Sequence, residues 1–555
     1  MSQIRKQGQR LRRVRPVDPA ALTEIRALLG DAPRQREYLI EHLHRIQDRF
    51  GHIDAAHLTA LAREMGLAPV ELYETASFYH HFDLVKEGEA PPPPVTVRVC
   101  DSISCELAGA GALADALERG LGDGVRVQRV PCVGRCDRAP VAVVGEQPVE
   151  AADPARVRAS LPLAGEPAPI PDRAIGYADY RSDGGYRLLQ ACVAGEREPG
   201  RVIAELERSG LRGLGGAGFP AARKWRILQR QPAPRLLVAN LDEGEPGTFK
   251  DRSCLERDPH RFLEGLLIAA WAVEAEAAYI YLRDEYAGCR RLLQRELERL
   301  RADPPVPLPP IHLRRGAGSY VCGEESALIE SLEGHRGLPR QRPPYVAERG
   351  LFGRPTLVHN LETLFRLREI LERGGDWFAG HGMNGRSGLR SFSVSGRVRR
   401  PGVHLVPAGI TLRQLIDDHC GGMLPGHRLR AWFPGGASGG ILPASLDHLP
   451  LDFDTLQEHG CFIGSGAIIV LSDRDDVRRA ALNAMRFFAQ ESCGQCTPCR
   501  EGTRRLAAMM AQERWDVALM EELATVMEDA SICGLGQAAP NPLRCLLRHF
   551  PEVCG

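Results

Sequence analysis

The sequence predicts a multidomain α/β protein. Its 555 residues suffice for roughly three to five domains with separate cores. Between residues 179 and 385, predicted strands (235–239 and 277–282) alternate with predicted helices (258–273, 286–301 and 323–333), which is typical of a doubly wound α/β layer. Groups of closely spaced cysteines lie on both sides of that region and indicate metal centres in neighbouring domains.

Composition narrows the possible partners and compartment. Lys+Arg and Asp+Glu balance at 71 each, and no basic stripe carries interleaved aromatics, so we expect no nucleic-acid partner. The longest apolar stretch, 262–282, is interrupted by glutamates, so we expect no direct membrane insertion. Sixteen cysteines, half of them clustered, indicate metal ligands in a reducing compartment rather than a disulfide framework, and hence a cytoplasmic protein.

The N-terminal region is predicted to be helical. Residues 1–18 are basic and lead into no hydrophobic segment, so we expect a solvated, disordered tail rather than a secretory signal. Over 19–90, apolar residues recur at helical spacing, and Asp18 and Asp54 stand at helix starts, which predicts a small helical bundle. The prolines at 91–94 form a stiff linker.

Residues 95–161 form a strand–helix–strand unit with four cysteines at its loop ends. Cys100 and Cys105 follow the first strand, and Cys132 and Cys136 follow the second. This arrangement can gather four thiolates around one centre, either a zinc ion or a [2Fe–2S] cluster. The spacing alone favours neither strongly.

A Pro/Gly linker at 162–178 leads to the α/β domain at 179–385, which contains a glycine-rich block at 212–225. Glycines 213, 215, 216 and 218 allow sharp turns, and a helix follows them. Such a loop presents free N–H groups and the positive end of a helix dipole, which suits a phosphate, and Lys224 adds a charge. The spacing differs from the usual dinucleotide fingerprint, so the block alone is weak evidence.

Two acidic blocks accompany the glycine block. The first follows an apolar strand at 236–239, where open α/β sheets bind ligands, and contains Asn240, Asp242, Glu243 and Glu245. In the second, Gly323, Glu324 and Glu325 open an amphipathic helix. For Glu243, Glu324 and Glu325 the alternative is a solvated helix start that compensates the dipole.

The C-terminal part predicts two further domains. Short strands around a small helix at 411–418 indicate a ubiquitin-like β-grasp domain over 386–470. Its glycine run, 434–440, lacks the lysine of a phosphate loop and is interpreted as a structural turn. Residues 471–555 predict a helical bundle, with a capping box from Ser472 to Asp475 and later helices at 503–512 and 515–528.

The last domain carries a C-x2-C-x2-C run and a distant fourth cysteine. This is the ligand spacing of a [4Fe–4S] cluster, whereas zinc sites usually take cysteines in pairs, so a zinc knuckle is the weaker alternative. The cysteines without such spacing are expected to be buried thiols or surface residues: Cys192, Cys254, Cys289, Cys322, Cys420, Cys461, Cys545 and Cys554.

The three blocks of the α/β domain, in this order, resemble the flavoprotein subunit of respiratory complex I and its relatives in NAD-linked formate dehydrogenases and NAD-reducing hydrogenases. The resemblance runs from about Gly176 to the C-terminus. Residues 20–160, including 99–105 and 132–140, resemble the thioredoxin-like [2Fe–2S] subunit that partners this flavoprotein. The resemblance implies a fusion of two usually separate proteins, with a thioredoxin-like domain and a Rossmann-like FMN domain.

The resemblance also implies the cofactors and their residues. FMN would be held by the glycine and acidic loops, with NAD(H) stacked on its ring. The residues implied to bind FMN or the nucleotide are Gly213, Gly215, Gly216, Phe219, Lys224, Asn240, Asp242, Glu243, Gly323, Glu324 and Asn360. Glu245 and Glu325 would stand near the nicotinamide half as the catalytic pair. One [2Fe–2S] cluster would be held by Cys100, Cys105, Cys132 and Cys136, and one [4Fe–4S] cluster by Cys493, Cys496, Cys499 and Cys533.

These parts predict an NADH:acceptor oxidoreductase, a diaphorase subunit that converts two-electron into one-electron transfer. Its expected assembly is a cytoplasmic NAD-dependent formate dehydrogenase, with a molybdenum or tungsten pterin subunit that carries further iron–sulfur clusters. A hydrogenase diaphorase and a complex I module are the alternatives, and the choice depends on the fused architecture alone. Two other classes stay open: an electron-transfer scaffold with a decayed nucleotide site, and a zinc-stabilised interaction protein.

Overall fold

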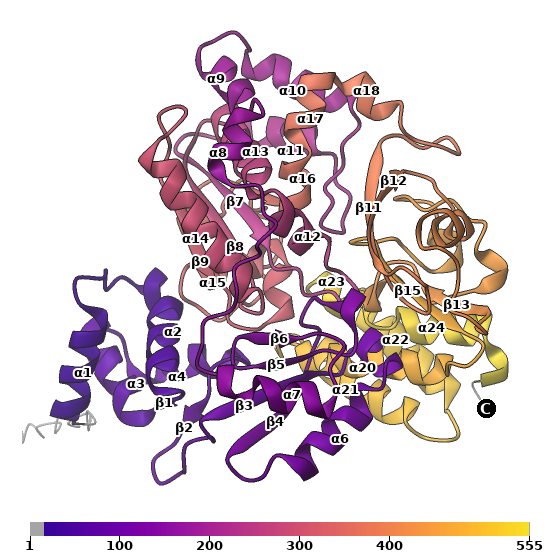
Figure 1. The fold of residues 1–555 in the computed structure, drawn as a ribbon, viewed down its shortest axis with the longest axis horizontal. Coiled ribbons are helices and arrows are strands. Elements are labelled where there is room, and N and C mark those ends of the chain that lie inside the picture. The colour runs from indigo at the N-terminus through magenta and orange to yellow at the C-terminus, as the bar shows by residue number, and fades with distance from the viewer. Residues whose placement is uncertain (1–15, 554–555) are drawn as a thin grey trace, which may run out of the picture. The chain divides into compact units, whose positions relative to one another are not determined.

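The computed structural model describes residues 16–553 (Figure 1). Most of the predicted basic tail and Cys554 therefore lie outside the described residues. The chain divides into two compact units, Met1–Pro92 and Pro93–Gly555, which are described separately. Among residues 16–553, no helix combines the length and apolar character that a membrane crossing requires.

The first unit is helical, as predicted. It contains α1 (Pro19–Leu29), α2 (Leu39–Phe50), α3 (Ala55–Met65) and α4 (Pro69–Phe78), with the short parallel strands β1 (Ile53–Asp54) and β2 (Leu84–Val85). Asp18 accepts hydrogen bonds from the first amides of α1, and Asp54 accepts one from the amide of His57 in α3. Both aspartates are therefore N-caps, which explains why these helices begin where the sequence predicts.

The second unit begins with a four-stranded sheet in the order β4-β3-β5-β6. Its strands are β3 (Val95–Cys100), β4 (Val125–Val130), β5 (Ala142–Val144) and β6 (Gln147–Val149). Helices α5 (Ile103–Leu107) and α6 (Ala110–Gly120) connect β3 to β4, and α7 (Pro154–Ser160) follows β6. Buried valines of β3 and leucines of α6 form the core, so the cysteine loops lie at the ends of a packed sheet.

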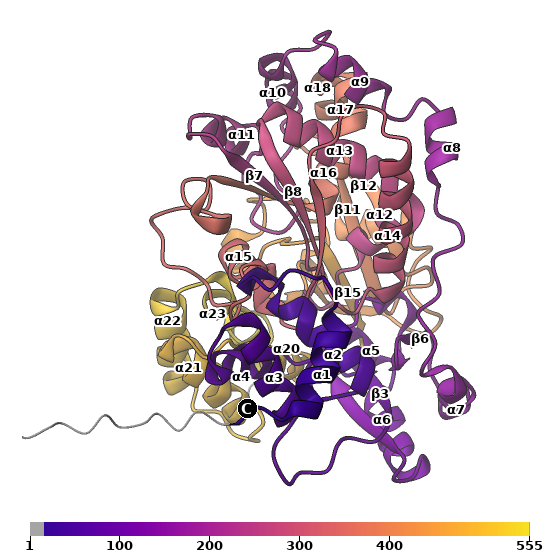
Figure 2. The same cartoon turned by 90° about the vertical axis from the view of Figure 1, so that its left-hand side faces the viewer.

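A parallel sheet in the order β10-β7-β8-β9 forms the centre of the next region. The strands are β7 (Arg235–Leu241), β8 (Ala275–Leu282), β9 (Ile311–Arg315) and β10 (Thr356–Asn360). In Figure 2, α11 (Ala221–Gln229) lies to the left of β7 and β8, and α13 (Pro259–Ala272) and α14 (Ala287–Ala302) lie to their right. β7 is buried along nearly its whole length, as parallel strands covered on both faces are.

Further helices surround this sheet. Before β7 lie α8 (Tyr177–Ser182), α9 (Arg187–Val193) and α10 (Pro199–Arg208), and α12 (Lys250–Arg257) follows it. Helix α15 (Glu325–Leu332) follows β9, and α16 (Leu361–Phe365), α17 (Leu367–Arg373) and α18 (Gly375–Ala379) follow β10. The order of strands reverses between β7 and β10, because the chain adds β8 and β9 on one side and then returns to the other.

The predicted β-grasp region is a mixed sheet in the order β12-β11-β15-β13-β14. Its strands are β11 (Leu389–Gly396), β12 (Gly402–Pro407), β13 (Leu429–Phe433), β14 (Leu442–Pro443) and β15 (Ala467–Ser472). β11 and β15 run parallel at its centre, and the short helix α19 (Leu412–Gln414) continues into one π-turn at Leu415–His419. The expected combination of short strands and one small helix is present.

The chain ends in helices α20 (Val477–Glu491), α21 (Thr497–Met510), α22 (Val517–Ala530), α23 (Gly534–Ala538) and α24 (Asn541–His549). The predicted capping box is wrong: Asp476 caps α20, whereas Asp475 accepts from the Ser472 amide and pairs with Arg397. The predicted start of α21 is also late, because a proline in the first turn begins this helix inside the cysteine loop.

Candidate functional site

The strand order places a candidate site at the carboxyl ends of β7 and β10. Asn240 and Asn360 are register partners on these strands, at the point where the strand order reverses. Open α/β sheets bind ligands at such a point. Asn240 donates to the Gly323 carbonyl at 2.8 Å, and Asn360 donates to Asp251 Oδ2 at 2.6 Å. Asn240 thereby joins the two acidic blocks that the sequence singled out, and Asn360 joins β10 to the helix that follows the first of them.

A cavity of about 350 Å³ opens at this edge. The predicted residues that line it are Gly215, Gly216, Asn240, Asp242, Glu243, Glu245, Gly323, Glu324 and Asn360. The predicted residues outside its lining are Gly213, Phe219, Lys224 and Glu325. The structure thus brings most of the predicted residues of the three blocks to one cavity, and four of them lie outside its lining.

The glycine block forms a hairpin against Asn360. The Gly213 amide donates to the Phe219 carbonyl at 2.8 Å, which closes the loop. A Cβ on Gly215 would lie 3.0 Å from the Asn360 Cβ, and a Cβ on Gly218, at φ +63°, would lie 2.5 Å from the Phe453 ring. The backbone approaches its neighbours too closely for side chains, so the loop forms a cradle with exposed main-chain groups that suits a phosphate.

Lys224 and Glu325 form an ion pair beside this cradle. The Lys224 Nζ lies 2.9 Å from Glu325 Oε2, and both side chains are 24% exposed. Burial opposes the charge of Glu325, but the Lys224 and Arg342 cations hold its pKa below the usual range. Phe219, at the other end of the hairpin, is an exposed aromatic ring with the Arg223 guanidinium 5.5 Å from its centroid. A charged pair and an open ring are therefore available to a nucleotide.

Glu243 and Glu324 both act as helix caps. Glu243 accepts from the amides of Asp251 and Arg252 at the start of α12, at 2.8 and 3.1 Å, and burial raises its pKa to about 7. Glu324 accepts from two amides in the first turn of α15. Glu324 thus stands at a helix start, as the alternative expects, whereas the solvated helix-start alternative is wrong for Glu243, which is buried and caps α12 from the preceding loop.

Glu245 is held by a residue that the sequence interpretation did not assign to the site. It accepts from the Ser438 amide at 2.8 Å, the Ser438 hydroxyl at 3.0 Å and the Tyr320 hydroxyl. Burial raises the pKa of Glu245 to about 7. Ser438 belongs to the 434–440 run and lines the cavity, so the interpretation of that run as a structural turn is incomplete.

Sequence reasoning missed further residues of the cavity wall: Tyr320, Lys250, Asp251, Ser438 and Ser465. The buried Lys250 ammonium lies 2.8 Å from Asp251 Oδ1 and 3.3 Å from Glu362 Oε2. Lys250 and Asp251 follow the first acidic block directly, so a charged pair next to a strand end was an available signal. For Ser438 and Ser465 the sequence gives none, because other domains deliver them.

Asp242 shows that the cavity fits a polar ligand. Its Oδ2 is buried and has no hydrogen-bond partner among the described residues, and burial raises its pKa well above the usual range. Leaving a buried polar atom without a hydrogen-bond partner costs free energy, so Asp242 Oδ2 favours binding of a ligand that supplies a hydrogen bond to it. The donors of a flavin mononucleotide meet that requirement, and the glycine cradle meets the requirement of its phosphate.

The N-terminal cysteines meet in one buried group. Cys100 ends β3, Cys105 lies in α5, and Cys132 and Cys136 follow β4. The Sγ atoms of Cys132 and Cys136 are 3.3 Å apart, and the Cys100 thiol contacts those of Cys105 and Cys132. Phe249, from the segment after the acidic block, packs against Cys132 and Cys136. The four sulfurs form a compact ligand set that fits a [2Fe–2S] cluster.

The C-terminal cysteines surround a second pocket, beside the first cavity. Cys493, Cys496, Cys499 and Cys533 all line it. Val321, Cys533 and Leu535 line both this pocket and the larger cavity. A ligand in the cavity and a cluster in the pocket would therefore share a wall. The remaining cysteines within residues 16–553 are free and buried.

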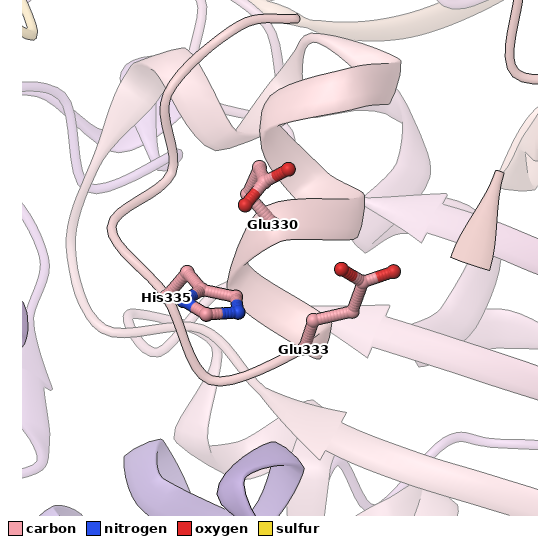
Figure 3. A group of neighbouring side chains, drawn as sticks. All are labelled: Glu330, Glu333 and His335. Carbon is pink, nitrogen blue, oxygen red and sulfur yellow. The ribbon is translucent and has the colours of Figure 1, made fainter. Parts of the chain in front are cut away.

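Glu330, Glu333 and His335 form a third group with metal-binding residue types (Figure 3). Arg340 Nε lies 2.5 Å from Glu330 Oε1, and Arg340 Nη2 lies 2.9 Å from Glu333 Oε2. Arg340 pairs with both carboxylates, so we interpret the group as an ion-pair cluster rather than a metal site.

Comparisons with known families match four segments of the chain, which together cover most of both units. Family models match over residues 25–163 (thioredoxin-like [2Fe–2S] ferredoxin), 206–369 (Nuo51 FMN-binding domain), 391–442 (SLBB domain) and 479–554 (NADH-ubiquinone oxidoreductase-F iron–sulfur binding region). An NADH-quinone oxidoreductase subunit of Rhizobium meliloti (strain 1021) is 40% identical over 387 residues, which are 67% of this chain and 91% of the relative. The chain belongs to the family of NADH-quinone oxidoreductase flavoprotein subunits.

Two other similarities extend this result. The mitochondrial NADH-ubiquinone oxidoreductase 51 kDa subunit of Neurospora crassa is 43% identical over 375 residues, 63% of this chain and 76% of that subunit. A chain of the NAD+-reducing [NiFe]-hydrogenase, in its H2-reduced crystal structure, is 33% identical with a TM-score of 0.81. That match covers 94% of this chain and 92% of the hydrogenase chain, so the whole fused architecture has a solved counterpart.

These findings confirm the family, the fold class and the cofactors that the sequence predicts. The chain is an NADH-oxidising flavoprotein diaphorase subunit of the complex I or NAD-reducing hydrogenase type, with FMN, one [2Fe–2S] cluster and one [4Fe–4S] cluster. The choice between zinc and iron–sulfur is thereby decided in favour of iron–sulfur.

Proposed function

We propose that the cavity at the ends of β7 and β10 is the flavin site, where electrons from NADH enter the chain and pass to the clusters. The observation that carries this proposal is the wall of Val321, Cys533 and Leu535, which separates the cavity from the [4Fe–4S] pocket. A donor and an acceptor on the two sides of one wall can exchange single electrons over a short path.

Each side chain has a specific task in this proposal. Gly213 closes the hairpin through its amide bond to the Phe219 carbonyl, and the amides of Gly215 and Gly216 bind the phosphate. The backbone of Gly323 lets the ring approach the sheet edge. Asn240, Asp242 and Asn360 hold the polar groups of the ligand, while Glu243 and Glu324 fix the loops through α12 and α15. When bound, the flavin accepts a hydride from NADH and gives up electrons one at a time.

The nucleotide binds next to the flavin. Phe219 offers an exposed ring for stacking, and Lys224 offers a cation within reach of a phosphate. Glu325 keeps Lys224 oriented, and Glu245, fixed by Ser438 and Tyr320, orients the nicotinamide half. The two cluster ligand sets are those named above: Cys100, Cys105, Cys132 and Cys136, and Cys493, Cys496, Cys499 and Cys533.

We propose a cytoplasmic NAD-dependent formate dehydrogenase as the assembly, with a molybdenum or tungsten pterin subunit as partner. The fused architecture supports it by analogy only. An NAD-reducing hydrogenase is the second candidate, favoured by the similarity of the entire chain to a hydrogenase chain. In both assemblies the other substrate is oxidised by the partner, so the two candidates differ in the metal of that partner.

Purification of the native complex tests both levels of this proposal. We expect bound FMN and NADH-driven dye reduction from the chain alone, together with molybdenum or tungsten and formate-driven NAD+ reduction from the complex. Nickel with H2-driven NAD+ reduction would replace the first assembly by the second. A chain that contains both clusters but neither binds FMN nor reduces dye would refute the flavin site and leave the scaffold hypothesis.

A further inference from the structure

Arg283, just after β8, is a buried cation that contacts both redox regions. Its side chain is 4% exposed. Nη2 donates to the Cys132 carbonyl at 2.7 Å, and Nη1 donates to the carbonyl of Glu243 in the acidic loop. One guanidinium thus joins the [2Fe–2S] loop to the wall of the flavin cavity.

Arg283 differs from Arg252, the other arginine that contacts the [2Fe–2S] loop, in its acidic partners and in the carbonyl that it bonds. Arg252 also contacts the cluster loop, at the Gly134 carbonyl, but Asp137 and Glu256 pair with it at 2.9 and 2.8 Å. Arg283 pairs with Glu285 at 2.8 Å, and it alone of the two bonds the carbonyl of a cluster ligand.

Tyr286 completes the contact and fixes the distance between the two regions. A Cβ on Gly134 would lie 2.2 Å from the Tyr286 hydroxyl, so the cluster loop rests directly on this ring. The Tyr286 hydroxyl donates to Glu243 Oε2 at 2.9 Å, and the Arg283 guanidinium lies 5.1 Å from the ring centroid. The cation is therefore held against the Cys132 loop by a hydrogen bond and by the Tyr286 ring.

We propose that Arg283 is a positioning residue that sets the reduction potential of the [2Fe–2S] cluster and ties its loop to the flavin cavity. The proposal rests on the ligand set and the flavin site proposed above. In the step concerned, the cluster gains one electron from the flavin that NADH has reduced. No bond breaks and no proton is taken up, so the cluster becomes more negative by one charge. A guanidinium cannot lose its proton in a protein, so this cation favours the reduced cluster at every working pH.

The test is an EPR-monitored redox titration of the purified holoprotein. At a fixed ambient potential, Arg283→Gln should lower the ratio of reduced to oxidised [2Fe–2S] cluster about tenfold, which is about 59 mV for one electron. Arg283→Lys keeps the charge and should recover most of the ratio. Arg290→Gln is the matched control, since Arg290 pairs with Glu146 at 2.6 Å but bonds no cysteine loop, and it should stay within roughly twofold of the parent.

Glu285→Gln gives an independent result if Arg283→Gln loses the cluster. It removes the anion that pairs with Arg283, so the reduced-to-oxidised ratio should rise roughly threefold or more. An unchanged ratio in Arg283→Gln at full cluster content, an unchanged ratio in Glu285→Gln, or an equal shift in Arg290→Gln would each overturn the proposal. Absence of a [2Fe–2S] signal from the parent would instead refute the ligand set, and absence of FMN from the parent would refute the flavin site.

Discussion

Lys250 is a buried cation that pairs with two buried carboxylates, and Lys250→Met tests how much it contributes to the stability of the cavity wall. The side chains of Lys250, Asp251 and Glu362 are 2%, 3% and 1% exposed. Methionine keeps most of the volume but removes the cation that pairs with Asp251, whereas Glu362 keeps the Arg366 guanidinium at 3.2 Å. Removing one partner of a buried pair costs about 3–5 kcal/mol, so we expect a loss of that size in the stability of the cavity wall.

Lys224→Met is the matched control, because it also removes a lysine–carboxylate pair next to the cavity. Its Nζ lies 2.9 Å from Glu325, but both side chains are 24% exposed. Water screens such a pair, so the expected loss is about 1 kcal/mol or less. The contrast between the two variants isolates burial as the cause.

Hydrogen exchange of peptides spanning 235–257 measures the local opening free energy in the parent and both variants. Burial raises the pKa of Asp251, and removal of Lys250 strengthens that effect. The Asp251 carboxylate therefore takes up a proton as the pH falls, and the loss in Lys250→Met should be smaller at pH 6 than at pH 8. Equal losses in the two variants, or a loss that does not change with pH, would refute this reasoning.

Three further predictions address the site itself. Burial raises the pKa of Glu245 to about 7, so the carboxyl is mostly neutral at pH 6 and ionised at pH 8. The Kd for the anionic NADH should therefore rise roughly three- to tenfold from pH 6 to pH 8 in the parent and stay flat in Glu245→Gln. A Kd that does not change with pH in the parent would contradict this. Cys496→Ser should lower the iron content from about six to about two atoms per chain and abolish the [4Fe–4S] signal, while Cys289→Ser should retain both clusters. Full iron content in Cys496→Ser would show that Cys496 does not belong to the ligand set. In Gly218→Ala the new Cβ overlaps the Phe453 ring, which costs about 1–3 kcal/mol and should lower the FMN that stays bound after gel filtration. Gly210→Ala is the control: Gly210 also has a positive φ but has open space around it, so this variant should retain FMN. Equal FMN content in both variants would show that the cradle tolerates a side chain.

Local patterns allowed much of the fold to be predicted. Helix starts at Asp18 and Asp54 follow from capping chemistry within a few residues, and the strand predicted at 235–239 from its apolar run is present as β7, which extends to Leu241. The capping box at Ser472 and Asp475 failed because Ser472 is the last residue of β15 and α20 begins only at Val477, with Asp476 as its N-cap, although the Asp475 carboxylate still accepts from the Ser472 amide. Sequence spacing alone does not show how long a turn separates a strand end from the next helix.

The site divides in the same way. The cysteine spacings and the glycine block indicate a class of ligand, a metal centre or a phosphate, because such ligands need several donors close together in the chain. By contrast, Ser438 reaches Glu245 across 193 positions, and Arg283 reaches Cys132 across 151. The cysteine spacing and the glycine-rich turn thus determined on their own that thiolate-held metal centres and a phosphate-bearing ligand were to be expected, whereas the identities of FMN and of the [2Fe–2S] cluster came from the family resemblance and the comparisons. Only the packing of the domains decided which residues hold Glu245, how the clusters lie beside the cavity and which cation faces the [2Fe–2S] loop. These contacts depend on the complementarity of surfaces that are distant in sequence.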